Sequence, residues 1–521
     1  MAKPGPRKTD DEVGYAWLAL TYGVEAVQPF AVQSRIGRAR HTLEHEGRRS
    51  ETYLESMRPP ATLSGHLTFA LKHEGVHLEF LARLFQKLPP ECLSEWVCSE
   101  PTGQYARRAG FLYEWLTEER LHIGKIGGNY RDVLSPDDYV TATHPRRNRR
   151  WRINDNLPGS RDYCPMVRRT PSVERSRGYD IRHQLESMEG EFGADILRRS
   201  AVWLTIKESR ASFIIEHEGD HQGRIQRFAS AMEAYCGQWE DPLAPEALSE
   251  LQGAILGLAT ISPGVRQSPV FVGSRSVAQG AVVHYVCPPW EWVPSLLSGL
   301  NVFLESTARE DAIIRAAVAS FGFVFIHPLA DGNGRISRFL INDILRRDGA
   351  VPEPFILPVS AAITSSSMRR IEYDRVLERY SRPLMRHYSD AVSFLSRPLL
   401  YPDGIESDFS FSAYETAGPT WRYPDLTDHV EYLEEIVRYT LEHEMHQQAA
   451  IQRAWYVTRE AVKEWVEGPD EHIDRIIRAI RQHGVVSGKL RRDFPILNDD
   501  ALAQRLESIV ADGFAGIDQS E

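Results

Sequence analysis

The segment from Phe325 to Arg338 is the feature that most constrains the fold. It reads FIHPLADGNGRISR and lies between two stretches of helical periodicity, AIIRAAVASFGFVF before it and RISRFLINDILRR after it. Gly332, Asn333 and Gly334 are turn-forming residues, so they predict a tight loop that ends at the N-terminus of the second helix. Backbone N–H groups at such a helix start point outward and favour anions, phosphate in particular.

Charged side chains surround this loop at informative spacings. Arg335 and Arg338 are three residues apart, so they share one helix face and can clamp further phosphates. Asp331 precedes the turn, where a carboxylate can hold Mg²⁺, and His327 is placed to act as a general base. An ordinary helix–loop–helix with solvated arginines is the alternative. The chain has no G-x-x-x-x-G-K-[ST] motif, which removes the P-loop as another explanation for phosphate binding.

The twelve-residue stretch HPLADGNGRISR resembles the Fic-domain signature H-P-F-x-D-G-N-G-R-x-x-R. One position departs, because Leu329 stands where the family has Phe, and this exchanges one apolar anchor for another. The residues 263–266, the run PVFVG and the residues 284–289 resemble the β-hairpin flap of Fic proteins and its exit. The resemblance covers roughly residues 206–384.

This resemblance implies a mainly α fold, with a Fic-like helical core and one β-hairpin flap. It implies an enzyme, a nucleotidyltransferase that moves AMP from ATP to a Tyr, Thr or Ser hydroxyl of a target protein. His327 would be the catalytic base, Asp331 would hold Mg²⁺, and the flap would align the target backbone. The nucleotide-binding residues it implies are Gly332, Asn333, Gly334, Arg335, Ile336, Ser337, Arg338 and Tyr373.

Many Fic proteins are restrained by a helix with the motif [ST]-x-x-x-E-[GN]. Ser212 and Glu216 match its first part within ASFIIEHEGD, whereas His217 departs from Gly or Asn. The resemblance therefore implies autoinhibition in which Glu216 pairs with Arg338. A plain solvated glutamate on an amphipathic helix is the alternative.

The pattern along the chain, taken together with this resemblance, implies three parts. These are an N-terminal helical domain with a basic connector (1–190), a Fic core (191–400, with the inhibitory helix at 205–220, the flap at 265–287 and the active loop at 327–338), and a C-terminal helical domain (401–521). Residues 15–121 are expected to be helical, and residues 143–177 and 403–425 to be loop-rich connectors. Helix is expected again over 426–466, followed by a compact unit over 473–514 that could be a winged helix at 470–516.

Two other classes of protein have some support. His73-Glu74-Gly75-Val76-His77 and the segment 217–221 both match H-E-x-x-H, the pattern of zinc peptidases, although each contains a helix-weakening Gly. A DNA-binding regulator with a nucleotide-sensing core is the other class. Its contact residues would come from the basic run 146–152 with Trp151 for stacking, or from the tail. The tail residues are Lys489, Arg491 and Arg492.

The overall charge and the cysteine content limit the partners and the cellular compartment that we expect. The formal net charge is −11, which argues against a dedicated nucleic-acid coat protein. Five scattered cysteines do not make a disulfide framework, so we expect a reducing, cytoplasmic environment. No apolar run approaches the length of a membrane span. The sequence identifies neither the target protein nor the oligomeric state, and leaves a homo-oligomer open.

Overall fold

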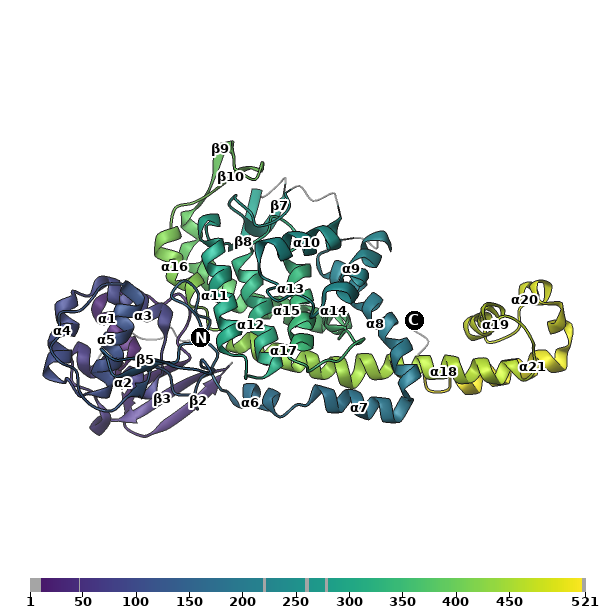
Figure 1. The fold of residues 1–521 in the computed structure, drawn as a ribbon, viewed down its shortest axis with the longest axis horizontal. Coiled ribbons are helices and arrows are strands. Elements are labelled where there is room, and N and C mark those ends of the chain that lie inside the picture. The colour runs from purple at the N-terminus through teal and green to yellow at the C-terminus, as the bar shows by residue number, and fades with distance from the viewer. Residues whose placement is uncertain (1–10, 46, 219–221, 258–261, 277–279, 518–521) are drawn as a thin grey trace, which may run out of the picture. The chain divides into compact units, whose positions relative to one another are not determined.

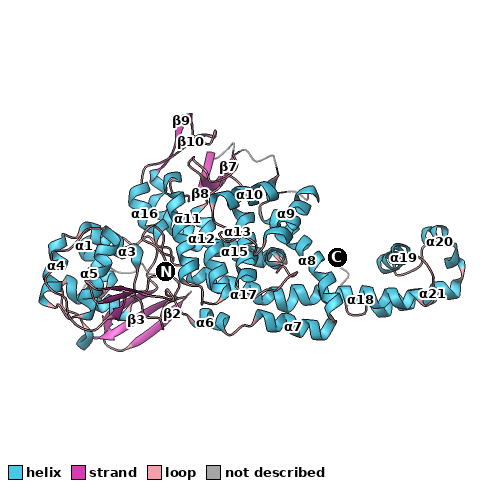
Figure 2. Ribbon diagram, in the orientation of Figure 1, coloured by secondary structure: helices cyan, strands magenta, loops and turns pink. Residues whose placement is uncertain are grey.

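The computed structural model describes residues 11–45, 47–218, 222–257, 262–276 and 280–517 (Figure 1). Helices predominate, and the described strands form small sheets of two or three strands (Figure 2). The mainly α class is therefore confirmed. None of the described helices is long and apolar enough to cross a lipid bilayer. The chain divides into two compact units, one of residues 1–179, 234–348 and 366–435, the other of residues 180–233, 349–365 and 436–521.

The N-terminal part of the first unit has helices around an apolar core and a small sheet. In the sheet, β1 and β3 are parallel, and β2 pairs with β3 in antiparallel fashion. The elements are α1 (Tyr15–Tyr22), β1 (Val32–Gly37), β2 (His41–His45), β3 (Arg48–Leu54), η2 (Glu55–Met57), α2 (Leu63–His73), α3 (Leu78–Lys87), α4 (Pro90–Ser99) and α5 (Gln104–Thr117).

The sheet corrects the expectation of helices throughout residues 15–121. Glu51 and Tyr53 on β3 are both buried, at the two-residue spacing of a strand. Arg40 and Arg49 pair with the Glu51 carboxylate at 2.8 and 3.0 Å, which makes burial of that charge tolerable. The sequence does not show the alternation of apolar and polar residues that is typical of a strand, because Glu51 occupies one of the buried positions of β3.

The basic segment 143–177 is likewise more ordered than the expected loop-rich connector. It contains β5 (Arg146–Asn148), β6 (Ile153–Asp155) and α6 (Pro171–Arg177), and β6 also pairs with β4 (Arg131–Asp132). Trp151 is fully buried, and its indole N–H donates to Glu114 at 2.7 Å. The prediction that Trp151 stacks on nucleic acid is therefore wrong, since its ring belongs to the core.

The rest of the first unit is a helical core with two hairpins. Helix α12 is buried along almost its whole length and packs against α13 and α11 (Figure 1). The elements are α10 (Pro245–Leu256), β7 (Phe271–Ser276), β8 (Gly280–Val286), η3 (Trp290–Trp292), α11 (Val293–Ser306), α12 (Ala312–Ile326), α13 (Asn333–Arg347), α15 (Ser367–Tyr388), η4 (Ser389–Ala391), β9 (Val392–Leu400), β10 (Glu406–Phe411), α16 (Tyr414–Arg422) and α17 (Thr427–Tyr439).

Strands β7 and β8 pair in antiparallel fashion, so the hairpin predicted at 265–287 is present. A second antiparallel pair, β9 and β10, was not expected. It corrects the interpretation of residues 403–425 as a connector, because β10 and the buried Trp421 of α16 lie within that range. Gly404 belongs to a turn of the range, whereas Gly418 and Pro419 lie inside α16.

The second unit is helical in the residues described. Its elements are α7 (Ile181–Phe192), α8 (Ala194–Ile215), α9 (Gln222–Tyr235), α14 (Val359–Thr364), η5 (Thr440–Met445), α18 (His446–Lys463), α19 (Asp470–His483), α20 (Gly488–Asp493), η6 (Pro495–Asn498) and α21 (Asp500–Gly513). The tail has a core of its own, which includes Ile473 and Phe514. Over 470–517 the described residues contain no strand that could form the wing of a winged helix.

Candidate active site

His327 follows the last residue of α12 in the left-handed conformation, with φ 52°. Its backbone N–H donates to the Phe323 carbonyl at 2.9 Å. The left-handed conformation of His327 then ends the helix. The ring Nδ1 lies 3.1 Å from the Val324 carbonyl oxygen. Because a carbonyl can only accept, Nδ1 carries the proton in the neutral ring and Nε2 is the basic nitrogen.

The loop after His327 is closed by the Asn333 side chain. Its Oδ1 accepts from the Leu329 N–H at 2.9 Å, and its Nδ2 donates to the Leu329 carbonyl at 2.8 Å. Both residues are buried. The Asn333 amide therefore has a structural task, and what this residue can offer a ligand is its backbone N–H at the start of α13.

Gly332 allows the sharp change of direction into α13. Its φ of 91° is one that other residues rarely adopt, and an added Cβ would lie 3.0 Å from Leu256. Its carbonyl accepts the first helical bond, from Ile336 N–H at 2.9 Å. The N–H groups of residues 333–335 therefore belong to the first turn, whose donors have no partner within the helix. The turn and the helix start that the sequence predicts are therefore present, and anion binding there stays a prediction.

The charged residues of the loop differ strongly in exposure. The Asp331 side chain is 65% exposed, and its Oδ1 accepts from Gly332 N–H at 2.6 Å and from Arg335 at 2.9 Å. The side chains of Arg335 and Arg338 are buried. Two buried guanidinium groups, one of them paired with Asp331, thus lie beside a helix N-terminus, which favours negative charge. The arrangement therefore suits a polyanion that approaches from the exposed side.

The other two predicted loop residues contribute differently. Ile336 is fully buried in the core, and the Ser337 hydroxyl donates to the Gly334 carbonyl at 2.8 Å. Their side chains therefore fix the helix, and a nucleotide-binding role would be left to their backbone. Tyr373, on α15, is buried, with its ring 6.1 Å from that of Tyr432. Its contact with a nucleotide stays a prediction.

Arg266, just before the flap, supports the loop in a way the sequence did not indicate. Its guanidinium is buried and donates to the carbonyls of His327 (2.7 Å), Pro288 (2.7 Å) and Ser268 (2.9 Å). The backbone N–H of Arg266 donates to the Pro328 carbonyl at 2.9 Å. One side chain thus ties the loop to both ends of the flap. Burial lowers the pKa of Arg266.

Gln252 on α10 makes a second connection of the same kind. It is fully buried, its Nε2 donates to the Asp331 carbonyl at 2.9 Å, and its Oε1 accepts from Gly264 N–H at 2.7 Å. A bridge between Val265 and Leu329 adds a strand-like contact beside it. Nothing in the spacing of Gln252 or Arg266 signals these contacts, since both depend on the return of distant segments.

The predicted regulatory pair lies at the end of α8, in the second unit. Ser212 is buried and Glu216 is exposed. His217 adopts φ 57°, a conformation for which Gly or Asn is usual, and the helix ends there despite the substitution. The departure at His217 thus leaves the helix end in place. The pairing of Glu216 with Arg338 stays a prediction.

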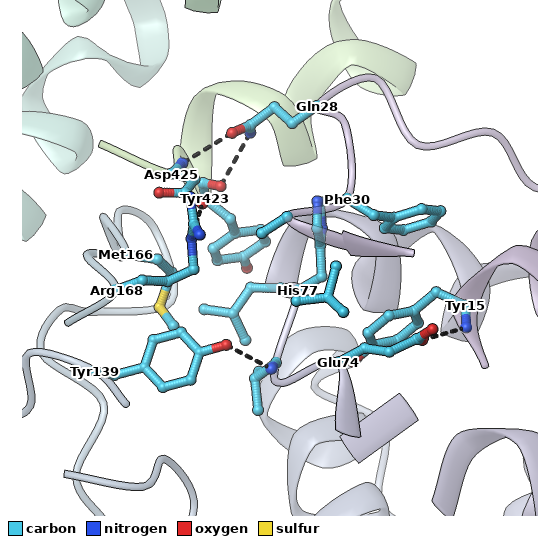
Figure 3. Close-up of a pocket in the computed structure, with 14 residues that line it drawn as sticks. Tyr15, Gln28, Phe30, Glu74, His77, Tyr139, Met166, Arg168, Tyr423 and Asp425 are labelled. Atoms are coloured by element: carbon cyan, nitrogen blue, oxygen red, sulfur yellow. Dashed lines mark hydrogen bonds and ion pairs between the residues drawn. The ribbon is translucent and has the colours of Figure 1, made fainter. Parts of the chain in front are cut away.

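The first H-E-x-x-H segment does not form a zinc site. Helix α2 ends at His73, Gly75 has φ 89°, and His77 caps the start of α3, so the two histidines are not on one helix. Glu74 lines a small cavity and accepts from Tyr15 N–H at 2.7 Å (Figure 3). In the second segment, residues 219–221 lie outside the described residues. Within the described ranges, no group of three potential metal-binding side chains occurs.

The three proposed DNA-contact residues of the tail differ in their contacts. Arg491 pairs with Asp500 at 2.8 Å, whereas Lys489 and Arg492 are exposed. Together with the buried Trp151, this leaves the DNA-binding alternative without a structural observation in its favour.

Comparison with known proteins identifies the central part of the chain. Residues 242–345 match the model of the Fic/DOC family. The protein adenylyltransferases fic-1 of Caenorhabditis briggsae and Caenorhabditis elegans are 36% and 35% identical over 113 and 121 residues. These alignments cover 21% and 23% of this chain and 20% and 22% of the relatives, so the chain spans about a fifth of the relatives' length.

Two solved structures also align with the chain. A Fic family protein from Desulfovibrio desulfuricans G20 is 19% identical, with a TM-score of 0.32, over 66% of this chain and 92% of that one. Fic-1 from C. elegans is 18% identical, with a TM-score of 0.28, over 63% and 96%. The family match rests on the sequence comparisons. Residues 242–345 are a Fic/DOC domain, and the resemblance of the loop signature is confirmed.

We predict that Arg266→Lys loosens the active loop. An ammonium cannot reach the carbonyls that the planar guanidinium joins, and a buried acceptor left without a donor costs about 1–3 kcal/mol. Amide hydrogen exchange of residues 329–332, followed by mass spectrometry, should be about tenfold faster or more. Arg397→Lys, on the exposed strand β9, is the matched control and should leave it unchanged. Unaltered exchange in Arg266→Lys would contradict the supporting role.

We predict a pH-dependent stability from Glu74. Burial raises its pKa to about 8, so the folded chain binds a proton that the unfolded chain releases above its own, lower pKa. Stability is therefore expected to fall as pH rises from about 4.5 to 8. Glu74→Gln keeps an oxygen for Tyr15 N–H and should melt at a higher temperature than wild type at pH 8, with a smaller difference at pH 5. Glu95→Gln, at an exposed position, should behave as wild type.

Proposed function

We propose that this chain is a protein adenylyltransferase, which transfers AMP from ATP to a Tyr, Thr or Ser hydroxyl of a target protein. The observation that supports this most directly is the loop geometry, with the base nitrogen of His327 at one end and a helix N-terminus flanked by two buried arginines at the other. The names of the fic-1 relatives, which share this region, agree with it.

The triphosphate would bind at the start of α13. The backbone N–H groups of Asn333, Gly334 and Arg335 would donate to the α- and β-phosphate oxygens. The guanidinium of Arg338 would bind the γ-phosphate. The Asn333–Leu329 pairing keeps these donors in place before ATP arrives, so little ordering would be needed on binding. The side chains of Ile336 and Ser337 would stabilise the first turns of α13 and would not contact the nucleotide.

The target hydroxyl would be activated by His327. Nε2 takes the hydroxyl proton, the oxygen forms a bond to the α-phosphorus, and the bond between that phosphorus and the bridging oxygen breaks. Pyrophosphate leaves with the electron pair, and AMP remains on the target. The hydrogen bond from Nδ1 to the Val324 carbonyl stabilises the imidazolium that forms during the transfer.

Asp331 would hold Mg²⁺ beside the loop. Its carboxylate is largely exposed, and both of its bonds within the loop use Oδ1, so Oδ2 could serve as the ligand. The ion would neutralise phosphate charge. Arg335 shares the same carboxylate and would keep it in position.

The flap is proposed to hold the target by strand addition to β7–β8, as in other backbone-directed recognition. The environment is proposed to be cytoplasmic, and the five cysteines are free thiols, as expected in a reducing compartment.

We predict that His327→Ala abolishes transfer and leaves ATP affinity nearly unchanged, because the phosphates are held by residues 332–338. Loss of a general base typically costs about 10²–10⁴ in rate. Incorporation of α-labelled ATP into lysate proteins and calorimetric titration with ATP measure the two effects. His144→Ala, at an exposed histidine, is the control. An equal loss of ATP affinity would show that His327 acts structurally.

We also propose that Glu216 restrains activity by occupying Arg338, and predict that Glu216→Gly raises self-modification and target labelling about tenfold or more. Adding Arg338→Ala should return labelling towards the wild-type level, because the released arginine orients the γ-phosphate. Glu218→Gly loosens the same helix end without removing this carboxylate and should not activate. High wild-type labelling that Glu216→Gly does not change would remove the inhibitory role.

A further inference from the structure

A hollow of about 460 Å³ lies at the surface between the flap region and the second hairpin. We call it the aromatic groove, after the aromatic side chains that line it. Phe409 and Phe411 are buried at its base, and the other four rings are partly exposed. These six are Trp290, Trp292, Tyr401, Phe409, Phe411 and Tyr414.

Three of the six rings pack on the core beneath them. Trp421 contacts Trp292, Phe411 and Tyr414, with ring centroids 6.4, 6.1 and 5.9 Å apart, and its indole N–H donates to the Val286 carbonyl at 3.2 Å. The Arg422 guanidinium lies 4.7 Å from the Trp292 ring. These three rings therefore lose little entropy on binding a ligand.

The groove is continuous with the segment that carries the flap. The Asp403 carboxylate, at the turn of the second hairpin, accepts from Gln267 N–H at 2.8 Å and from the Ser268 hydroxyl at 2.7 Å. The Phe271 ring, at the start of β7, lies 4.8 Å from that of Phe409. Figure 1 shows the second hairpin beside the flap. A polypeptide held by the flap could thus extend into the groove.

The edge of the groove is acidic. Glu291 and Glu415 line it and are both exposed, and none of the described residues that line it is Lys or Arg. A second hollow of about 370 Å³ shares Trp290 and Glu291 and adds Asp241 together with the buried Arg266. Aromatic rings with carboxylates at the edge complement an extended chain that alternates apolar rings with positive charges.

We propose that the aromatic groove binds a proline-rich, basic segment of the protein substrate. Proline-rich segments are already extended before binding, and their rings pack on aromatic faces without leaving a backbone N–H unsatisfied. Arg or Lys between the prolines would pair with Glu291 and Glu415. The proposal rests on the proposed transfer to a protein, and it makes the groove a specificity site separate from the active loop.

Binding of a fluorescein-labelled peptide of repeated Pro-Pro-Arg units to the full chain tests the proposal by fluorescence anisotropy. We expect saturable binding that weakens with salt, and little binding of a peptide with Ala in place of Pro or Glu in place of Arg. Trp290→Ala should weaken binding about tenfold or more, as expected for a partly exposed ring that the peptide would cover. Trp203→Ala, at an exposed tryptophan outside the groove, is the matched control.

The double variant Glu291→Gln with Glu415→Gln keeps side-chain shape and should remove the salt dependence, whereas Glu406→Gln, on β10, should not. Unchanged peptide affinity in the folded double variant and in Trp290→Ala would overturn the proposal. So would a groove occupied by a second copy of the chain, seen as an oligomer that Trp290→Ala dissociates. Peptide binding and AMP labelling are measured separately. Absence of peptide binding would contradict the groove proposal, and absence of AMP labelling would contradict the proposed transfer.

Discussion

The structure depends on the satisfaction of backbone polar groups in the loop between α12 and α13. Part of the loop, including Pro328 and Leu329, is buried, and an unpaired N–H or carbonyl there is costly. Asn333 pairs with both backbone groups of Leu329, and Arg266 and Gln252 bind carbonyls of His327 and Asp331. Because these side chains take up the internal acceptors, the amides at the start of α13 can be directed at a ligand.

The same contacts couple the loop to its surroundings. Arg266 also donates to carbonyls on both sides of the flap. Asp403 of the second hairpin accepts from Gln267 and Ser268, which follow Arg266 in the chain. A displacement of the residues at the base of the flap would therefore shift the backbone at His327, the residue that we propose as the general base.

Several sequence predictions failed for related reasons. The strand β3 contains Glu51 at an inward position, so its pattern did not resemble a half-buried strand. Trp151 follows a run of arginines, yet Gly110 on α5 leaves space for its ring, because a Cβ there would lie 2.2 Å from it. Such outcomes require knowledge of which distant segment supplies the partner or the space, and neither is encoded in local periodicity.

The sequence by itself determined the active loop, the flap hairpin and the helical class, because turn residues, alternation and helical periodicity act over a few neighbouring positions. It also predicted which residues would bind phosphate and take a proton. Only the tertiary structure decided that Asn333 closes the loop with its side chain, that Arg266 and Gln252 support it, and that six rings meet beside the flap. These are contacts between segments far apart in the chain, and the free energy of burying polar and aromatic groups together selects them only once the whole unit is folded.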